Sequence, residues 1–231
     1  MRTMHDIEDC KTCAYRSVLF SNLRPEDLSR VNISREEKEF RPGEVIVRQG
    51  DKITSFMYLR KGLLKISREM NDGKNQIISI ARPFDFIGLL SVFSESHYQF
   101  SITAIEKSSL CFIDLGLMRE IIGKDGHFAL KLLENMSNMN DMIMDNWLMI
   151  NQKNLRGRIA YILLFFSNEI YRKEEYHLPV SRKEIAELIH MRTENVIRIL
   201  SEFRRDGIIG IEGKLIKILE KEQLNRIAEY G

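Results

Sequence analysis

The chain has few cysteines and no long apolar segment. Its three cysteines in 231 residues are an odd, low number, which excludes a disulfide-stapled scaffold and favours a reducing cytoplasm. The longest apolar run, residues 159–166, is too short to cross a bilayer. The first 13 residues alternate in charge and lack the apolar core of a signal peptide. We therefore expect a cytoplasmic protein without a membrane partner.

The chain also lacks an excess of charge of one sign and any pattern typical of catalysis. Lys and Arg number 35 against 33 Asp and Glu, a net charge of +2, which excludes a strongly basic, non-specific clamp on nucleic acid. No Ser-His-Asp arrangement, paired carboxylates, phosphate loop or His-x-x-x-His motif is present. We do not expect an enzyme. A length of 231 residues leaves room for one large or two modest domains, and hydrophobic residues, at 44% of the chain, can form a core.

Residues 180–225 carry the clearest pattern in the chain. A short helix is predicted to begin after Ser181, whose hydroxyl can cap it with Glu184 as the capping-box partner. A turn at residues 190–192 precedes a second predicted helix over residues 193–205. Apolar residues recur at helical spacing in both: Ile185, Leu188, Ile189, Val196, Ile199, Leu200 and Phe203. Two helices joined by so short a turn predict a helix-turn-helix.

A hairpin follows the second helix and predicts a wing. Two short strands, residues 208–211 and 215–219, flank a turn at Glu212-Gly213-Lys214. In such a motif the second helix lies in the major groove of double-stranded DNA. Arginine can donate to guanine there and glutamate can accept from cytosine. The candidate DNA contacts are Arg182, Arg192, Thr193, Glu194, Asn195, Arg198 and Lys214, with Arg182 and Lys214 expected at phosphates.

Four segments follow from turn residues and apolar periodicity. Residues 1–22 form a charged arm. Residues 23–127 hold short β-type runs separated by turns, which predict a jelly-roll-like β-roll: 44–49, 56–60, 63–68, 76–81, 101–105 and 109–113. Residues 128–154 contain no Gly or Pro and predict one long helix, and residues 155–231 form the winged helix-turn-helix domain. The predicted fold class is α+β.

The long helix is predicted to be a dimerisation helix. One stripe holds Leu132, Met136, Met139, Ile143 and Ile150, with Asn146 set into it. Such a stripe is typical of the seam between two helices, where one polar residue fixes the register. The alternative is a helix packed on its own domain. We expect a homodimer through residues 128–154.

The order of roll, long helix and winged helix-turn-helix resembles the Crp/Fnr superfamily of bacterial transcription regulators across essentially the whole chain. The residues that carry this resemblance are Arg41-Pro42-Gly43-Glu44, Gln49-Gly50-Asp51, Tyr58-Leu59-Arg60-Lys61-Gly62, Phe86-Ile87-Gly88 and Gly157-Arg158-Ile159-Ala160. The resemblance implies a homodimer on a two-fold-symmetric operator and a contact with RNA polymerase. The alternative is a sensor or scaffold module with a partner other than DNA. The direction of control does not follow from the sequence.

The resemblance also bears on the effector. Family members that bind cyclic AMP place Glu just after the cassette Gly and an Arg-Ser pair further on, where this chain has Leu89, Gln99 and Phe100. A buried phosphate without its arginine lacks a charge-assisted partner, so the sequence argues against cyclic AMP. The candidate pocket residues are Gly88, Leu89, Leu90, Gln99, Phe100 and Ile143. They line a pocket for an apolar effector or fill the core.

The cysteines resemble those of the Fnr branch, which holds an iron–sulfur cluster with an N-terminal cysteine cluster and one cysteine in the roll. Cys10, Cys13 and Cys111 match three of the four positions, and Leu19 stands at the fourth. Four thiolates are usual for such a cluster. A non-cysteine ligand, His5 or Asp9, would have to complete it.

Two other interpretations of the cysteines stay open, a thiol redox switch and ordinary packing. Haem is less favoured, because the five histidines show no spacing that singles out a ligand. His190 has a separate interpretation, since it stands in the turn where relatives usually carry Gly. If its φ is positive, the backbone is strained there.

Overall fold

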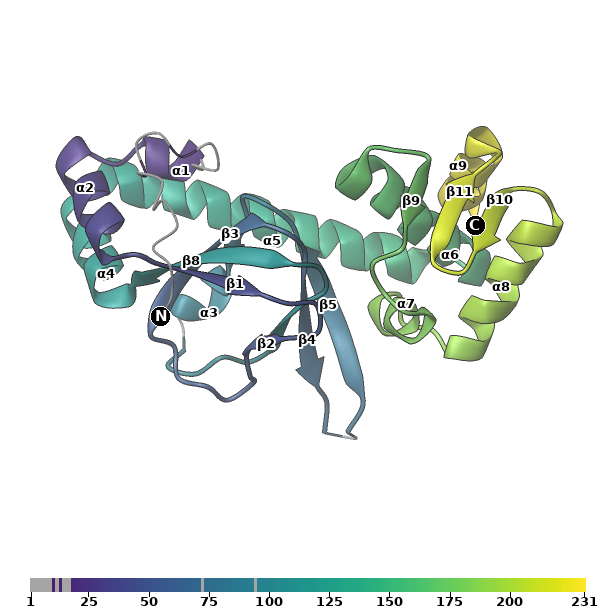
Figure 1. The fold of residues 1–231 in the computed structure, drawn as a ribbon, viewed down its shortest axis with the longest axis horizontal. Coiled ribbons are helices and arrows are strands. Elements are labelled where there is room, and N and C mark those ends of the chain that lie inside the picture. Colours follow the sequence, from purple (N-terminus) through teal and green to yellow (C-terminus); the bar gives the residue numbers. More distant parts are fainter. Residues whose placement is uncertain (1–9, 11–12, 14–17, 72, 94) are drawn as a thin grey trace. The chain divides into compact units, whose positions relative to one another are not determined.

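The structure, a computed structural model, describes residues 10, 13, 18–71, 73–93 and 95–231. The described residues form two compact units. The first contains the residues up to Ile66 together with Ile80–Asp141, and the second contains Ser67–Ser79 together with Met142–Gly231. Figure 1 shows the order of helices and strands along the chain, which gives a β-roll, a long helix and a winged helix-turn-helix. The predicted fold class is confirmed.

The roll consists of two four-stranded sheets, with strand orders β1-β8-β3-β6 and β2-β7-β4-β5. Its strands are β1 (Glu36–Phe40), β2 (Val45–Val47), β3 (Ser55–Lys61), β4 (Leu64–Glu69), β5 (Asn75–Ala81), β6 (Phe86–Ile87), β7 (Ser101–Ala104) and β8 (Ser108–Asp114). Phe56, Leu59 and Leu110 are fully buried in the core of this unit. Gly62 has a φ of 88°, and a Cβ there would lie 2.3 Å from the Ser108 hydroxyl, so this turn requires glycine.

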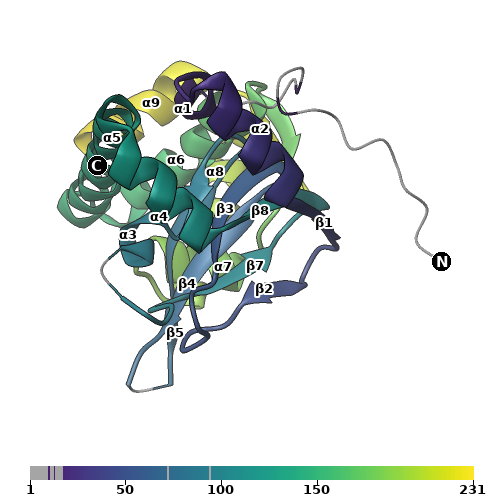
Figure 2. The same cartoon turned by 90° about the vertical axis from the view of Figure 1, so that its left-hand side faces the viewer.

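The first unit also contains helices that were not predicted individually. They are α1 (Val18–Ser21), α2 (Pro25–Ser34), α3 (Leu89–Val92) and α4 (Leu115–Lys124). Figures 1 and 2 show α2 and α4 beside each other, next to the start of α5 (Gly126–Gln152). The carboxylate of Asp125 accepts from the backbone N–H of Phe128 at 3.0 Å, so α5 begins two residues before the predicted position.

The predicted dimer stripe of α5 packs within the chain. Leu132 is buried in the core of the roll, and Met136 and Met139 pack against it. Asn146, expected to fix a dimer register, instead accepts a hydrogen bond from the Tyr161 hydroxyl. In the single chain this stripe is therefore partly covered by its own unit, and its role as a dimer seam stays a prediction, because an apolar period identifies a face but not what covers it.

A second stripe of α5 carries exposed apolar side chains. Leu130, Leu133, Met144 and Trp147 are all exposed in the single chain. With the exposed Ser137 and Asn140 between them, they recur at intervals of three and four residues along one side of the helix. This surface, called here the exposed α5 stripe, is a second candidate contact face.

The second unit contains the winged helix-turn-helix. It comprises α6 (Leu155–Leu164), the π-helix η1 (Phe165–Tyr171), β9 (Glu175–His177), α7 (Arg182–Leu188), α8 (Thr193–Arg205), β10 (Ile209–Glu212), β11 (Leu215–Ile218) and α9 (Lys221–Tyr230). The predicted capping box is confirmed, since Ser181 and Glu184 exchange side-chain and backbone hydrogen bonds at 3.2 and 2.8 Å. The wing has a third strand, β9, which pairs with β11. Among the described residues, no helix is both long and apolar enough to span a membrane.

Candidate DNA interface and cysteine cavity

Helix α8 has one buried and one exposed face. Val196, Ile199, Leu200 and Phe203 are at most 3% exposed and hold it in the unit. The opposite face presents Glu194 and Arg198, as the sequence predicted. The other candidate contacts of this helix lie around its start, with Arg192 exposed and Thr193 and Asn195 half-buried. A helix packed along one face and polar along the other has the form that enters a major groove.

Arg198 has a partner within the helix. Its guanidinium donates to Glu202 one turn further on, and Glu202 also accepts from Arg156 of α6 at 2.8 Å. Arg156 donates to Asp206 at 3.3 Å as well, so this ion-pair group ties α8 to α6. Arg198 remains 55% exposed. Its guanidinium can therefore exchange Glu202 for a base without disturbing the core.

The turn between α7 and α8 is tight and strained. His190 has a φ of 55°, which confirms the condition set by the sequence. The N–H of Met191 donates to the carbonyl of Ala186 at 2.9 Å, and the Arg158 guanidinium donates to the carbonyls of Ile189 and His190. Burial, and secondarily Arg158, lower the pKa of His190. The His190 imidazole is therefore harder to protonate than an exposed histidine.

The two expected phosphate contacts differ in their surroundings. Arg182 donates to the carbonyl of Gly213 at 3.0 Å, which joins the start of α7 to the wing turn. Burial lowers the pKa of this guanidinium. Lys214, next to Gly213 in the wing turn, is exposed. Arg182 therefore has a hydrogen-bond partner within the unit, whereas Lys214 is exposed, and the phosphate contacts of both stay predictions.

The candidate effector residues fill core and surface positions. Leu89 is 1% exposed within the roll core, and Phe100 is half-buried against it. Gly88 has a φ of 75°, and a Cβ there would lie 3.0 Å from the Tyr98 ring. Gln99 is exposed and donates to the carbonyl of His97. Among the described candidate pocket residues, none has a cationic side chain that could replace the arginine of the cyclic AMP pattern at a phosphate. The side chain of Leu90 lies outside the described part of the chain.

Ile143, the last candidate effector residue, is half-buried on α5. It belongs to the second unit, whereas Leu89 and Phe100 belong to the first.

The three cysteines line one small cavity in the first unit. This cysteine cavity has a volume of about 20 Å³, which is room for about one water molecule. Its walls are Cys10, Cys13, Phe20, Val31, Arg35, Tyr58, Arg60, Cys111 and Ile113. The sequence prediction that these cysteines share a location agrees with this arrangement.

Strand register explains how the cavity is built. Cys111 lies in the middle of β8, opposite Glu37 of β1 and Tyr58 of β3. Arg60 follows Tyr58 by two residues and so lies on the same face of β3. Arg35 immediately follows α2, and its guanidinium lies 3.7 Å from the Cys111 sulfur. Three segments distant in sequence therefore meet at the sulfurs.

Two buried guanidiniums accompany the thiols. The side chains of Arg35 and Arg60 are only 2% and 9% exposed, and they share one carboxylate, Glu37. Glu37 also accepts from the Ser109 hydroxyl at 2.7 Å. Burial raises the pKa of the Cys111 thiol to about 11, although Arg35 acts in the opposite direction. Cys111 is therefore a protonated thiol at neutral pH in this arrangement.

The donor set is incomplete for a four-thiolate cluster. Leu19, at the fourth position, is buried in the core of the roll, 5% exposed. The alternatives His5 and Asp9 lie outside the described residues. Across the described part of the chain, no three His, Cys, Asp or Glu side chains are arranged to hold a metal ion. The cavity brings three thiols together, but its residues do not fit the cluster as they stand.

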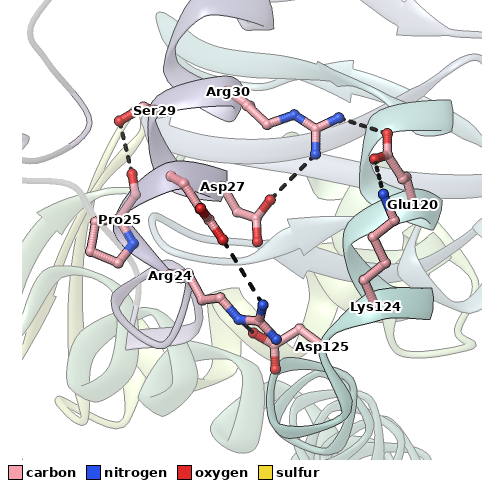
Figure 3. Close-up of polar contacts among 9 residues, drawn as sticks. Arg24, Pro25, Asp27, Ser29, Arg30, Glu120, Lys124 and Asp125 are labelled. Atoms are coloured by element: carbon pink, nitrogen blue, oxygen red, sulfur yellow. Dashed lines mark hydrogen bonds and ion pairs between the residues drawn. The ribbon is translucent and has the colours of Figure 1, made fainter.

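Polar contacts connect the surroundings of the cavity to the start of α5. At one end of α2, Asn32 accepts from the N–H of Cys10 at 3.0 Å. At the other end, Arg24 donates to Asp125, which caps α5, at 3.1 Å. Between them, Arg30 donates to Glu120 of α4 at 2.6 Å, and Figure 3 shows this network of α2, α4 and Asp125. Helix α2 and the residue before it therefore contact both Cys10 and Asp125, the residue that caps α5.

Comparison with known proteins agrees with this architecture. Residues 37–125 match the cyclic nucleotide-binding domain, and residues 157–227 match the Crp-like helix-turn-helix domain. The chain belongs to the Crp/Fnr family of transcription regulators. Within this family, the roll keeps the fold of a cyclic nucleotide-binding domain while its Leu89 and Gln99 depart from the cyclic AMP pattern.

The chain matches known regulators over most of its length and nearly all of theirs. Electron transport regulator A of Shewanella oneidensis is 27% identical over 227 residues, covering 95% of this chain and 90% of that protein. The fumarate and nitrate reduction regulatory protein of Escherichia coli is 24% identical, covering 96% and 90%. FixK2 from Bradyrhizobium japonicum has a TM-score of 0.74 at 23% identity, covering 84% of this chain and 96% of that one.

Proposed function

We propose that this Crp/Fnr family member is a homodimer that binds an inverted-repeat operator through α8 and responds to a redox signal at the cysteine cavity. The observation that carries the DNA-binding part is the exposed face of α8, with Glu194 and Arg198 one turn apart. Arginine and glutamate at this spacing can contact neighbouring base pairs. The proposal places the protein in the cytoplasm with its DNA, and by family resemblance it includes a contact with RNA polymerase.

The exposed α5 stripe supports the homodimer. Leu130, Leu133, Met144 and Trp147 would leave apolar surface in water in a monomer. Two copies of the stripe can bury one another about a two-fold axis. A two-fold dimer presents two α8 helices to successive major grooves, with half-sites about 10 bp apart.

Selection from a pool of randomised DNA tests this proposal. The selected sequences should contain an inverted repeat, and sedimentation should give one dimer for each duplex. Leu133→Glu should produce monomers and lose operator binding together, while Glu134→Gln, a neighbouring exposed position, should do neither. Tight, sequence-selective binding by a monomer would contradict the dimer.

Cyclic AMP is not the proposed effector. Leu89 and Phe100 occupy or pack against the core, and exposed Gln99 offers no charge to a phosphate. Calorimetry with millimolar cyclic AMP should therefore show no saturable heat. Micromolar binding that also raises affinity for the selected operator would overturn this part.

The cysteine cavity supports the redox signal. The cavity brings three thiols together with two buried arginines, and buried arginines are unusual in a protein core. A peroxide could convert two of the thiols to a disulfide with release of two waters. Helix α2 offers a route by which a change at the cavity can alter the cap of α5.

Mass spectrometry of the thiols before and after peroxide, with iron and sulfide analysis of anaerobic protein, tests this signal. A disulfide, or iron and sulfide lost on exposure to air, should accompany a change in operator affinity. Cys111→Ser should lose the iron and sulfide, or any disulfide that involves Cys111. Iron-free protein whose operator affinity is insensitive to oxidant and unchanged by triple Cys→Ser substitution would remove the cysteines from the proposal.

A further inference from the structure

The DNA-facing side of α8 contains an apolar residue that the sequence analysis did not single out. Ile197 is 52% exposed, although its neighbours Val196 and Ile199 are fully buried. It follows Glu194 by three residues and precedes Arg198 by one. At 3.6 residues per turn these three side chains share one face of the helix. The face proposed to enter the major groove is therefore partly hydrocarbon.

The packing of α8 does not explain this isoleucine. The buried face of the helix is complete without it, through Val196, Ile199, Leu200 and Phe203. Single exposed apolar residues are ordinary on protein surfaces. Ile197 differs because it lies between the two charged side chains proposed to contact bases. If α8 enters the groove, the Ile197 side chain is surrounded by DNA and loses its contact with water.

We propose that Ile197 determines specificity by contacting the 5-methyl group of a thymine in each half-site. This inference rests on the proposed function, because it requires α8 in the major groove. Thymine is the base that presents a methyl group there, whereas the other edges offer donors and acceptors that isoleucine cannot satisfy. Glu194 and Arg198 then select the hydrogen-bonding base pairs beside it.

A uracil scan of the selected operator tests the assignment. Each thymine is replaced in turn by deoxyuridine, which removes only the methyl group and keeps the hydrogen-bonding edge. At one thymine position in each half-site, this replacement should lower the affinity of the unaltered protein about fourfold. That loss is equivalent to one buried methyl group. In Ile197→Ala the same replacement should have no effect. The helix should be preserved, because alanine is the strongest helix former and the site is exposed.

Ser201→Ala is the matched control, because Ser201 is exposed on the same face one turn later and its hydroxyl donates to the Ile197 carbonyl. This variant should keep the methyl effect. The inference would be overturned, with the proposed function intact, if removing each thymine methyl group lowered the affinity of the unaltered protein no more than that of Ile197→Ala. Failure to select any sequence would instead overturn the proposed function.

Discussion

The α8 surface and the cysteine cavity use charge in opposite ways. On α8 the guanidinium of Arg198 is more than half exposed. In the cavity, Arg35 and Arg60 are almost completely buried, with one carboxylate between them. Exposed charges keep their hydration until a polyanion arrives, and they contribute little to folding. Buried charges lose hydration when the chain folds, so each depends on its partner.

This difference in burial separates the surface proposed to recognise DNA from the cavity proposed to sense the redox signal. A side chain that contacts DNA can change without unfolding the unit, and so α8 can vary in specificity. The cavity holds groups whose replacement affects the roll itself, so a chemical change at its sulfurs has a structural effect. The contrast predicts that mutations in the cavity reduce stability, whereas mutations on α8 reduce DNA affinity.

The largest effect is expected for Arg60→Ala. The Arg60 side chain is only 9% exposed, so its removal breaks the ion pair with Glu37 and leaves its packed stem unreplaced, which should lower the free energy of unfolding by about 3 kcal/mol. Urea denaturation followed by circular dichroism measures it. Lys107→Ala removes an exposed partner of Glu39 and should cost less than about 1 kcal/mol. Equal losses in the two variants would remove the distinction between buried and exposed charge.

Arg198→Ala should affect DNA binding instead of stability. Loss of a base contact should weaken binding to the selected operator by about 1–3 kcal/mol and relax selectivity at one base pair. Arg205, 76% exposed at the last turn of α8, is the matched control and should lose less selectivity. Fluorescence anisotropy on operator and random DNA measures both. An equal loss on the two DNAs would assign Arg198 to phosphate contact.

Ser181→Ala should have a smaller effect on stability. The serine caps α7 and belongs to a complete capping box, so its loss should cost about 1 kcal/mol of unfolding free energy. Ser201→Ala, which removes a hydroxyl bonded only to its own helix, should lie within about 0.5 kcal/mol of the unaltered protein. A thermal melt compares them. The absence of any difference would mean that packing alone positions α7.

The helix-turn-helix was predictable because its signals are local. The capping box at Ser181, the apolar spacing of α8 and the glycine turn of the wing all lie within a few residues of the structure they specify. The limits of α8 agree with the prediction for the same reason. Strand β9 was missed, since its pairing with β11 depends on a segment about 40 residues away.

The roll and its cavity were less predictable because they depend on distant contacts. Strand β1 has the sequence Glu-Glu-Lys-Glu-Phe, which lacks an apolar pattern, and becomes a strand by pairing with β8 at the sheet edge. No motif marked Arg35, and Arg60 stood in a turn motif that did not indicate its burial beside the cysteines. The same limit applies to α5, where the sequence analysis predicted one stripe and did not identify the exposed α5 stripe, which only the packing of the helix distinguishes.

The smallest effect concerns Glu120, which links α2 to α4 at the surface. Hydrogen bonds from Arg30, then from Lys124, lower the pKa of Glu120 from 4.5 to about 2. Because the folded-state pKa is the lower one, the ionised carboxylate stabilises the fold above pH 4.5, and this contribution is lost as the pH falls to 2. Glu120→Gln should therefore melt slightly below the unaltered protein at pH 6, with the gap closing towards pH 2. Added salt should also narrow the gap, since the pair is exposed. A difference in melting temperature that stays constant from pH 6 to pH 2 would show that the ion pair between α2 and α4 does not stabilise the roll.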